Sequence, residues 1–304
     1  MVVPAQPEVL QHTGSTLSEY LERQGYVLGE VLGSGAGGTV HLARNREGQT
    51  VAIKILSPNS DSASYVQYNP RKGEPLAHQL SRHENILSPT TIIYRNQNYQ
   101  FADSPAEGQN PQIAAVVMPT EPNLQPLLLE SIPPELRTLP NILNLFKQVA
   151  DGLLHLHQNE VLHRDLKPDN ILVSPQGKVY IIDFGLAIQN NGEVSSPVNQ
   201  NLFAAPERIN RTDDNSRLVY SFPSDVWTLG RIMHSFLTNQ EPSGTIFDTQ
   251  RFDYSLLPSL PSGYECLNEL LSDMLRVTAT ERPTAEDVSR RLDKLLSTHR
   301  TETP

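Results

Sequence analysis

Cysteine is almost absent from this sequence. The single cysteine, Cys266, excludes an internal disulfide and any zinc site built from several cysteines. One free thiol is typical of a reducing compartment, so we expect a cytoplasmic protein. The alternative is a secreted effector that acts in the cytoplasm of a host cell.

Basic residues and long apolar runs are scarce as well. The chain has 24 Lys and Arg against 34 Asp and Glu, a formal net charge of −10. This balance disfavours a nucleic-acid-binding protein, because such a protein needs a basic face. No apolar run approaches the roughly 20 residues of a membrane span. The first 14 residues lack the pattern of a signal peptide. We therefore expect neither a nucleic-acid partner nor a membrane span.

The residues that are present indicate two parts of different character. The chain has 304 residues, of which 38% are hydrophobic, enough for one large domain or two lobes. Four stretches rich in β-branched and small residues predict strands. They are residues 26–45, which contain a glycine cluster, and residues 50–57, 90–96 and 112–119. A proline-rich stretch at 119–126 reads as the boundary to a helix-rich second part.

Three further features are expected in the first part. Residues 15–24 predict one short helix that ends at Gly25. Residues 75–82 predict another, with Pro75 at its start. Residues 96–111 are polar, and we expect an exposed excursion there.

The second part predicts helices joined by one hairpin. Apolar residues recur near helical spacing over 140–156. Ser224 is the expected N-cap of a second helix, and Thr284 and Asp287 match the capping-box spacing at the start of the last one. The expected helices are 140–156, 224–238, 264–276 and 284–298, and the hairpin is 171–183. Together with the strands, these helices predict an α+β fold.

The glycine cluster "GSGAGGTV" places Gly33, Gly35 and Gly38 in a GxGxxG pattern. Glycines let backbone N–H groups approach phosphate oxygens without a Cβ between them. The pattern alone is weak. A strand follows it instead of a helix, which disfavours a dinucleotide fold. A flexible glycine hairpin is the alternative.

Lys54 lies in the apolar strand "VAIK". A lysine is costly to bury without a partner. It either faces water at a sheet edge or serves as a cation for phosphate oxygens, positioned by a carboxylate. Glu74 is the glutamate of the next helical stretch that suits this second interpretation.

The stretch "VLHRDLKPDNILV" at 161–173 has polar residues between two apolar ends. Asp165 is a carboxylate that can accept a hydroxyl proton, and Lys167 beside it can neutralise a phosphoryl group. Asn170 and Asp183 supply two oxygen ligands suited to Mg²⁺. Any one of these residues is as easily a solvated loop residue. The whole set in this order favours phosphoryl transfer.

On these motifs the chain resembles the eukaryotic-type (Hanks-type) serine/threonine protein kinase family. The resemblance covers residues 26–298. Its motifs match the signature set of that family. They are "GSGAGGTV", "VAIK", "HRDLKPDN", "DFG" (183–185), "APE" (205–207), "DVWTLG" (225–230) and "ERP" (281–283).

The resemblance implies an α+β, two-lobed fold with a small antiparallel sheet and one helix in the N-lobe and a larger helical C-lobe. It also implies that ATP and Mg²⁺ (or Mn²⁺) bind between the lobes. Asp165 is then the catalytic base, Lys167 contacts the γ-phosphate, and Asn170 and Asp183 bind the metal. The implied ATP-binding residues are Leu32, Gly33, Ser34, Gly35, Ala36, Gly37, Gly38, Val40, Ala52, Lys54, Glu74, Met118, Glu121 and Leu172.

Three structural roles follow from the same resemblance. Glu207 and Arg282 are expected to form a buried ion pair. Asp225 is expected to tie its helix to the catalytic loop. In the hinge, Met118 would be the gatekeeper, and Glu121 would donate its backbone N–H to adenine.

The chain departs from the family pattern at three positions. Pro75 follows Glu74, so Glu74 is expected at a helix start or a kink. His78 stands where the family usually has an apolar residue, through either a local alignment slip or an unusual packing. Gln200 stands where serine/threonine kinases usually have a threonine. The pair Lys167-Pro168 is nevertheless typical of the serine/threonine class.

Regulation is left open by the sequence. Arg164 precedes the base, as in kinases that are switched on by loop phosphorylation. The only hydroxyl side chains between "DFG" and "APE" are Ser195 and Ser196, which are possible phosphosites. The alternative is a loop ordered by its own packing.

The leading hypothesis is a protein serine/threonine kinase that also phosphorylates itself. A pseudokinase that acts as a nucleotide-binding scaffold is the main alternative, and a small-molecule kinase is a weaker one. The substrate is expected to be a protein. The expected domain boundaries are a tail at 1–25, the kinase domain at 26–298 (N-lobe 26–118, hinge 119–123, C-lobe 124–298) and a tail at 299–304.

Overall fold

A computed structural model describes the chain at residues 16–35, 37–57, 69–80, 82–98, 100–105, 111–189, 202–208, 220–242 and 254–300. These residues form two compact units. Unit 1 holds the described residues up to 57 together with Thr91–Val117. Unit 2 holds Asn69–Thr90 and the described residues from Met118 onward.

Unit 1 is built on an antiparallel sheet of six strands in the order β1-β2-β3-β6-β4-β5. Its apolar core lies beneath the central strands, where Ile53, Ile93 and Ala115 are almost fully buried. β-Branched residues favour these positions because they pack well on a pleated surface. The strands are β1 (Val27–Gly35), β2 (Gly38–Arg44), β3 (Thr50–Ile55), β4 (Thr91–Arg95), β5 (Phe101–Ala102) and β6 (Gln112–Pro119).

The prediction of an exposed excursion at 96–111 holds for most of its described residues, but the excursion also contains a short strand that was not predicted. Phe101 and Ala102 form β5, which pairs with Arg95 and Tyr94 of β4. The ring of Phe101 lies 5.7 Å from the ring of Tyr20, and this apolar contact accounts for the extra strand.

A short helix before the sheet, α1 (Leu17–Arg23), confirms the prediction for 15–24. The Thr16 hydroxyl accepts the Glu19 N–H at 3.2 Å, and the Glu19 carboxylate accepts the Thr16 N–H at 2.9 Å, which is a complete capping box. Leu21 is fully buried in the core of unit 1. Gly25, with a φ of 86°, reverses the chain after the helix.

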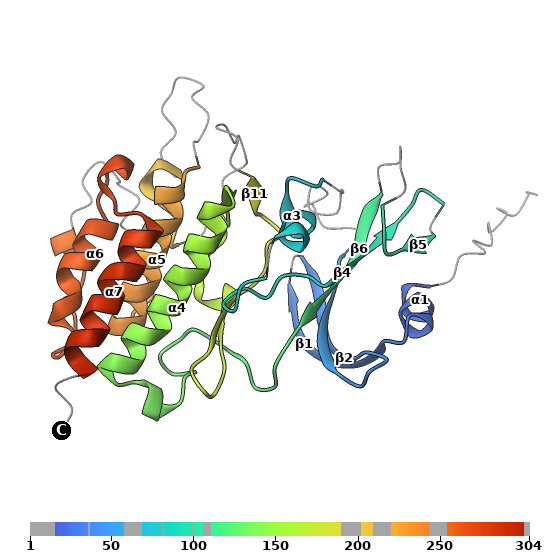
Figure 1. The fold of residues 1–304 in the computed structure, drawn as a ribbon, viewed down its shortest axis with the longest axis horizontal. Coiled ribbons are helices and arrows are strands. Elements are labelled where there is room, and N and C mark those ends of the chain that lie inside the picture. Colours follow the sequence, from blue (N-terminus) through green and yellow to red (C-terminus); the bar gives the residue numbers. More distant parts are fainter. Residues whose placement is uncertain are drawn as a thin grey trace, which may run out of the picture. The chain divides into compact units, whose positions relative to one another are not determined.

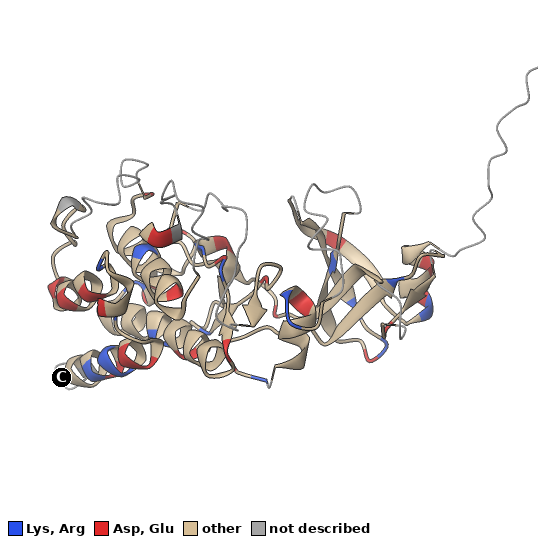
Figure 2. Ribbon diagram, turned by 90° about the horizontal axis from the view of Figure 1, so that it is seen from above, with Lys and Arg blue, Asp and Glu red and all other residues tan. Residues whose placement is uncertain are grey.

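Unit 2 is mainly helical around one large apolar core. Its helices are α3 (Gly73–Gln79), α4 (Leu139–Gln158), α5 (Phe222–Thr238), α6 (Asn268–Met274) and α7 (Ala285–Arg300). Figure 1 shows α4 and α7 side by side. Figure 2 shows basic and acidic positions together along α7. Arg291 of α7 binds Asp273 of α6 at 2.8 Å.

Two expected helix starts were wrong. Ser221, not Ser224, is the N-cap of α5, because Pro223 fits the first turn of a helix. The Ser224 hydroxyl instead donates to Glu207 at 2.7 Å. The helix expected at 75–82 begins at Gly73 and ends at Gln79, so Pro75 lies in its first turn.

Short strands complete unit 2. β7 (Gln125–Pro126), β9 (Ile171–Val173) and β10 (Val179–Ile181) form a three-stranded sheet, and β8 (Val161–Leu162) pairs with β11 (Ile188–Gln189). Single 3₁₀ turns connect several elements, at Pro134–Leu136, Pro168–Asn170, Pro206–Arg208, Tyr254–Leu256, Glu265–Leu267 and Ala279–Glu281. The α+β fold class predicted from the sequence is confirmed. Within the described ranges, none of the helices has the length and apolar character that a membrane crossing requires.

Candidate active site

The polar loop of residues 163–170 lies between β8 and β9 in unit 2, and its side chains converge on Asp165. The Asn170 amide nitrogen donates to the Asp165 carboxylate at 3.1 Å and to the Asp165 carbonyl at 2.7 Å. The Lys167 ammonium lies 3.5 Å from the same carboxylate oxygen, Oδ2. Asp165 is almost buried, at 8% exposed, whereas the Lys167 side chain remains 38% exposed. A carboxylate held in this way keeps a defined orientation.

Backbone contacts join this loop to the segment that carries Asp183. The Ile182 N–H donates to the Asn170 carbonyl at 3.0 Å. The His163 ring nitrogen Nε2 donates to the Ile182 carbonyl at 3.1 Å, while Nδ1 accepts the Asp165 N–H at 3.3 Å. Asp183, the next residue after Ile182, therefore lies beside Asn170.

Two residues of this region have left-handed backbone conformations, which are uncommon for residues other than glycine. Arg164 has a φ of 70° and Asp183 has a φ of 60°. Arg164 directly precedes the predicted base Asp165, and Asp183 is itself a predicted metal ligand. Such conformations cost about 1–3 kcal/mol and cluster at functional sites.

The donor set around Asn170 and Asp183 fits a Mg²⁺ ion. Both hydrogen bonds of the Asn170 side chain use its nitrogen, which leaves its Oδ1 oxygen as a ligand atom. The Asp183 carboxylate accepts the Gly185 N–H at 3.3 Å. Amide and carboxylate oxygens are the ligands that Mg²⁺ prefers, usually together with substrate phosphates. Among the described residues, no group of three His, Cys, Asp or Glu side chains is placed to hold a metal without such a substrate.

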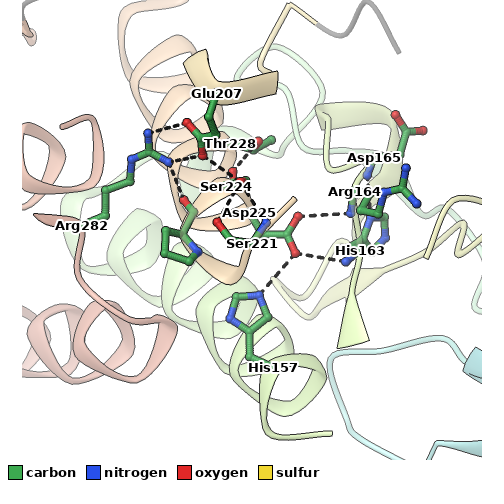
Figure 3. Close-up of polar contacts among 11 residues, drawn as sticks. His157, His163, Arg164, Asp165, Glu207, Ser221, Ser224, Asp225, Thr228 and Arg282 are labelled. Carbon is green, nitrogen blue, oxygen red and sulfur yellow. Dashed lines mark hydrogen bonds and ion pairs between the residues drawn. The ribbon is translucent and has the colours of Figure 1, made fainter. Parts of the chain in front are cut away.

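Asp225 is hydrogen-bonded to the loop, as Figure 3 shows. Its two carboxylate oxygens accept the backbone N–H groups of His163 at 3.0 Å and Arg164 at 3.1 Å. His157 of α4 contacts the same carboxylate at 3.3 Å. Burial alone would raise the pKa of Asp225, but the hydrogen bond and charge of His157 and the charge of His163 lower it below its usual value. The first turn of α5 therefore fixes the backbone immediately before Asp165.

Glu207 and Arg282 form the ion pair that the resemblance implies (Figure 3). The shortest contact joins Nη1 of Arg282 to Oε1 of Glu207 at 2.7 Å. The guanidinium also lies 4.8 Å from the ring of Trp227 in α5. Burial would raise the pKa of Glu207, but the hydrogen bonds and charge of Arg282 outweigh it and lower the pKa.

The glycine turn and Lys54 lie together in unit 1. Val40 pairs directly with Lys54 across β2 and β3. A Cβ atom built on Gly37 would lie 3.6 Å from Cε of Lys54, so the lysine side chain lies beside the turn. Gly38 has a φ of 132°, and a Cβ there would come within 2.1 Å of the Ile55 carbonyl oxygen. Only glycine fits that position.

The remaining predicted residues of unit 1 that the structure describes lie in strands β1 and β3. A Cβ on Gly33 or Gly35 would meet no heavy atom within 4 Å in the described structure. Ala52 pairs with Leu42 in the middle of the sheet. Leu32 is half exposed, and the Ser34 hydroxyl donates to Thr39 at 3.3 Å. Ala36 lies outside the described residues.

Glu74 lies in the first turn of α3 in unit 2 and is buried, at 4% exposed. His78, four residues later, is exposed and contacts the Thr90 carbonyl at 3.2 Å through Nε2. Leu76 and Ala77 provide the buried apolar face instead. His78 therefore does not take the apolar position that the family pattern assigns to it.

The segment before α3 pairs with the segment after Phe184, a contact that sequence reasoning missed. Gly73 N–H donates to the Ala187 carbonyl at 2.8 Å, and Gln189 N–H donates to the Arg71 carbonyl at 3.0 Å. Lys72 and Ile188 form an antiparallel β-bridge between these two hydrogen bonds. No pattern in the sequence indicates this pairing, because it joins a loop to the two-residue strand β11 more than a hundred residues away.

The predicted hinge residues lie at the end of β6 and just beyond it. Met118 is partly buried, and the Glu121 carboxylate accepts a hydrogen bond from the hydroxyl of Tyr180 in β10. Leu172 lies in the adjacent strand β9 and pairs with Tyr180 of β10. Tyr180 was not among the predicted site residues, because its partner lies 59 positions away.

Arg164 is buried, and its guanidinium lies 4.1 Å from the ring centroid of Tyr220. Tyr220 is buried with Leu162 and Ile188 in a small apolar cluster. Sequence reasoning missed this aromatic partner. The possible phosphosites Ser195 and Ser196, and also Gln200, lie outside the described residues.

Comparison with known proteins places these features in one family. A model described as "Protein kinase domain" matches residues 26–291. Mitogen-activated protein kinase kinase kinase 1 of Arabidopsis thaliana is 29% identical over 269 residues, covering 86% of this chain and 40% of that protein. A probable serine/threonine-protein kinase of Dictyostelium discoideum is 32% identical over 226 residues, covering 73% and 40%.

A third relative, sperm motility kinase 2B of Mus musculus, is 29% identical over 282 residues, covering 86% of this chain and 50% of that protein. The chain therefore spans half or less of the length of these three relatives.

Proposed function

The chain belongs to the protein kinase family, among its serine/threonine members, and from this premise we propose that it transfers the γ-phosphate of ATP to a serine or threonine hydroxyl of a protein. One observation carries the proposal. The almost buried Asp165 is oriented by Asn170, has Lys167 at 3.5 Å, and is joined through Ile182 to the segment of Asp183.

The proposed step is an in-line displacement. The Asp165 carboxylate accepts the proton of the substrate hydroxyl while that oxygen forms a bond to the γ-phosphorus. The bond from the γ-phosphorus to the bridging oxygen breaks, and ADP leaves with that electron pair. The Lys167 ammonium offsets negative charge on the transferring group.

Asn170 and Asp183 are the residues that would hold Mg²⁺. When bound, Mg²⁺ neutralises charge on the phosphates and fixes their orientation. The glycine turn would supply backbone N–H groups, and Lys54 would supply a cation, for the phosphates. Glu121 and Leu172 would contact adenine. ATP and divalent metal use are general in this family.

The protein substrate is proposed by class only. Lys167-Pro168 is typical of serine/threonine kinases, and autophosphorylation is part of the proposal. The single cysteine, Cys266, favours a reducing compartment such as the cytoplasm.

The test is phosphate transfer followed by intact-mass spectrometry. Wild type, Asp183→Asn and Asp169→Asn are each incubated with Mg·ATP and a generic basic protein. Asp169 is exposed in the same loop and is the matched control for loss of one carboxylate. We expect mass gains of phosphate units with wild type and Asp169→Asn, and a loss of about 10²-fold or more with Asp183→Asn.

Two results would overturn the proposal. Equal mass gains with all three proteins would indicate a contaminating kinase. No gain with any of them, together with thermal stabilisation by ATP, would indicate a pseudokinase that binds nucleotide.

A further inference from the structure

One side-chain hydrogen bond in unit 2 holds the predicted hinge. The Tyr180 hydroxyl donates to the Oε1 atom of Glu121. Tyr180 lies in the centre of β10 and is almost fully buried, at 3% exposed. Glu121 lies two residues beyond the end of β6.

The same small sheet holds the chain a few residues later. Gln125 and Pro126 form β7, which pairs with Val173 and Leu172 of β9. The Leu127 N–H donates to the Ile171 carbonyl at 2.8 Å. The chain is thus attached to one sheet at two places: Glu121 through its side chain to β10, and β7 through its backbone to β9.

The groups around the bond make it a strong one. The phenol is buried, and burial together with the nearby Glu121 carboxylate raises the pKa of Tyr180 above its usual range. The hydroxyl therefore keeps its proton and stays a donor at neutral pH. Hydrogen bonds to a carboxylate are roughly twice as strong as neutral ones. The Lys178 ammonium lies 5.1 Å from the Tyr180 ring centroid and packs on the same ring.

Few other hydrogen bonds to described residues hold the chain between β6 and β7. Pro119, the last residue of β6, has no N–H to donate, and Asn123 has a left-handed φ of 60°. The Thr120 hydroxyl donates to the Glu121 carbonyl at 3.4 Å, a local contact that does not reach the sheet. The Glu121 side chain is therefore the contact that fixes this segment against β10.

We propose that Tyr180 is a positioning residue for ATP, because its hydroxyl fixes Glu121, whose backbone N–H is predicted to bind adenine. The proposal rests on the proposed function. A backbone donor that is already fixed loses less conformational entropy when a ligand binds. Loss of the Tyr180 hydroxyl should therefore weaken ATP binding without slowing the chemical step.

The experiment compares ATP affinity and steady-state kinetics in Tyr180→Phe and wild type. The phenylalanine keeps the ring and its packing and removes only the hydroxyl. Mg·ATP affinity is measured by calorimetry, so that binding is read without turnover. We expect Kd and the KM for ATP to rise roughly three- to tenfold, with kcat within about twofold.

Three further variants make the test specific. Tyr264→Phe removes another tyrosine hydroxyl of unit 2, which donates to the Arg137 carbonyl at 3.1 Å, and should leave ATP affinity unchanged. Glu121→Gln keeps a carbonyl acceptor and should lose less affinity than Glu121→Ala. The double variant Tyr180→Phe/Glu121→Ala should lose no more affinity than either single variant, because both remove the same bond.

The outcomes separate this proposal from the proposed function. Wild-type affinity in Tyr180→Phe, even with a lower Tm, would overturn the positioning role and leave the kinase activity untouched. Wild-type protein that binds Mg·ATP but transfers no phosphate would overturn the kinase activity, while the calorimetric comparison would still decide the role of Tyr180. Wild-type protein that binds no ATP would overturn both.

Discussion

Arg282 and Glu207 are joined by two parallel hydrogen bonds, from Nη1 to Oε1 at 2.7 Å and from Nη2 to Oε2 at 2.8 Å. The other three N–H groups of the guanidinium donate to the carbonyls of Arg276, Pro223 and Val277 at 2.7–3.0 Å. All five donors of Arg282 therefore have acceptors. The pair fastens the "APE" segment to the start of α5 and to the turn before α7.

We predict that Arg282→Met destabilises the protein by about 3–5 kcal/mol, because it removes a fully buried guanidinium and leaves the partly buried Glu207 carboxylate and three carbonyls without their donors. Arg282→Lys should lose less, since it keeps the charge but not the two parallel bonds. Urea unfolding followed by circular dichroism measures both changes. An unfolding midpoint for Arg282→Met equal to that of wild type would contradict the prediction.

Acid should weaken the same region. The folded-state pKa of Glu207 is lowered from an ordinary 4.5, and that of Asp225 is lowered from an ordinary 3.8. A lowered carboxylate pKa contributes stability that is present above the unfolded pKa and lost as pH falls through the folded pKa. We therefore expect the free energy of unfolding to fall progressively below about pH 4.5. Glu207→Gln should flatten that decline, and an unchanged slope in this variant would count against the assignment.

Arg231 of α5 carries a buried charge whose hydrogen-bond partners among the described residues are incomplete. It is 4% exposed, and its Nη1 atom has no hydrogen-bond partner among the described residues. Burial lowers the pKa of Arg231 to about 10. We predict that Arg231→Met stabilises the protein by about 1–4 kcal/mol, since an apolar side chain avoids the desolvation of the charge.

The control for Arg231→Met is Arg290→Met, on the exposed face of α7. The Arg290 side chain is 72% exposed and pairs with Asp287 at 2.6 Å. Its replacement should change stability by no more than about 0.5 kcal/mol. A lower Tm for Arg231→Met than for wild type would refute the prediction for α5.

Phosphorylation of Ser195 and Ser196 is predicted not to be required for activity. The buried Arg164, which resembles the phosphate-binding arginine of other kinases, already packs 4.1 Å from the Tyr220 ring centroid. Ser195→Ala/Ser196→Ala should therefore keep kcat within about threefold. Tyr220→Leu should lower kcat about tenfold or more, because the backbone of Arg164 leads directly to Asp165. Tyr220→Phe, which keeps the aromatic ring beside Arg164, should lose less activity than Tyr220→Leu.

Initial rates with the generic protein substrate measure these variants, and mass spectrometry maps any phosphate. Loss of activity in the double alanine variant, with restoration by acidic residues at both positions, would show that loop phosphorylation is required.

Much of the fold could be predicted because its signals are local. Apolar spacing indicated α4, β-branched runs indicated β3 and β6, and Thr16 and Glu19 are close enough in the chain to cap one helix. Helix starts were harder. Ser221 and Ser224 are both residue types that cap helices, and local sequence did not show that Ser221 takes the cap while the Ser224 hydroxyl pairs with Glu207.

The sequence by itself determined which chemical groups the site contains. Asp165, Lys167, Asn170 and Asp183 have fixed spacings along the chain, so a reader of the sequence can identify them as a set. Spacing cannot say which distant side chains support that set. The Asp225 contacts with His163 and Arg164 span more than 60 residues, and the resemblance rather than any local pattern implied them.

Only the tertiary structure decided the partners of Tyr180, Tyr220 and Gly73. Each contact joins residues that are far apart in the chain, and each depends on how strands and loops pack. Such packing is set by burial and hydrogen-bond satisfaction over the whole of unit 2, and no short segment contains that information.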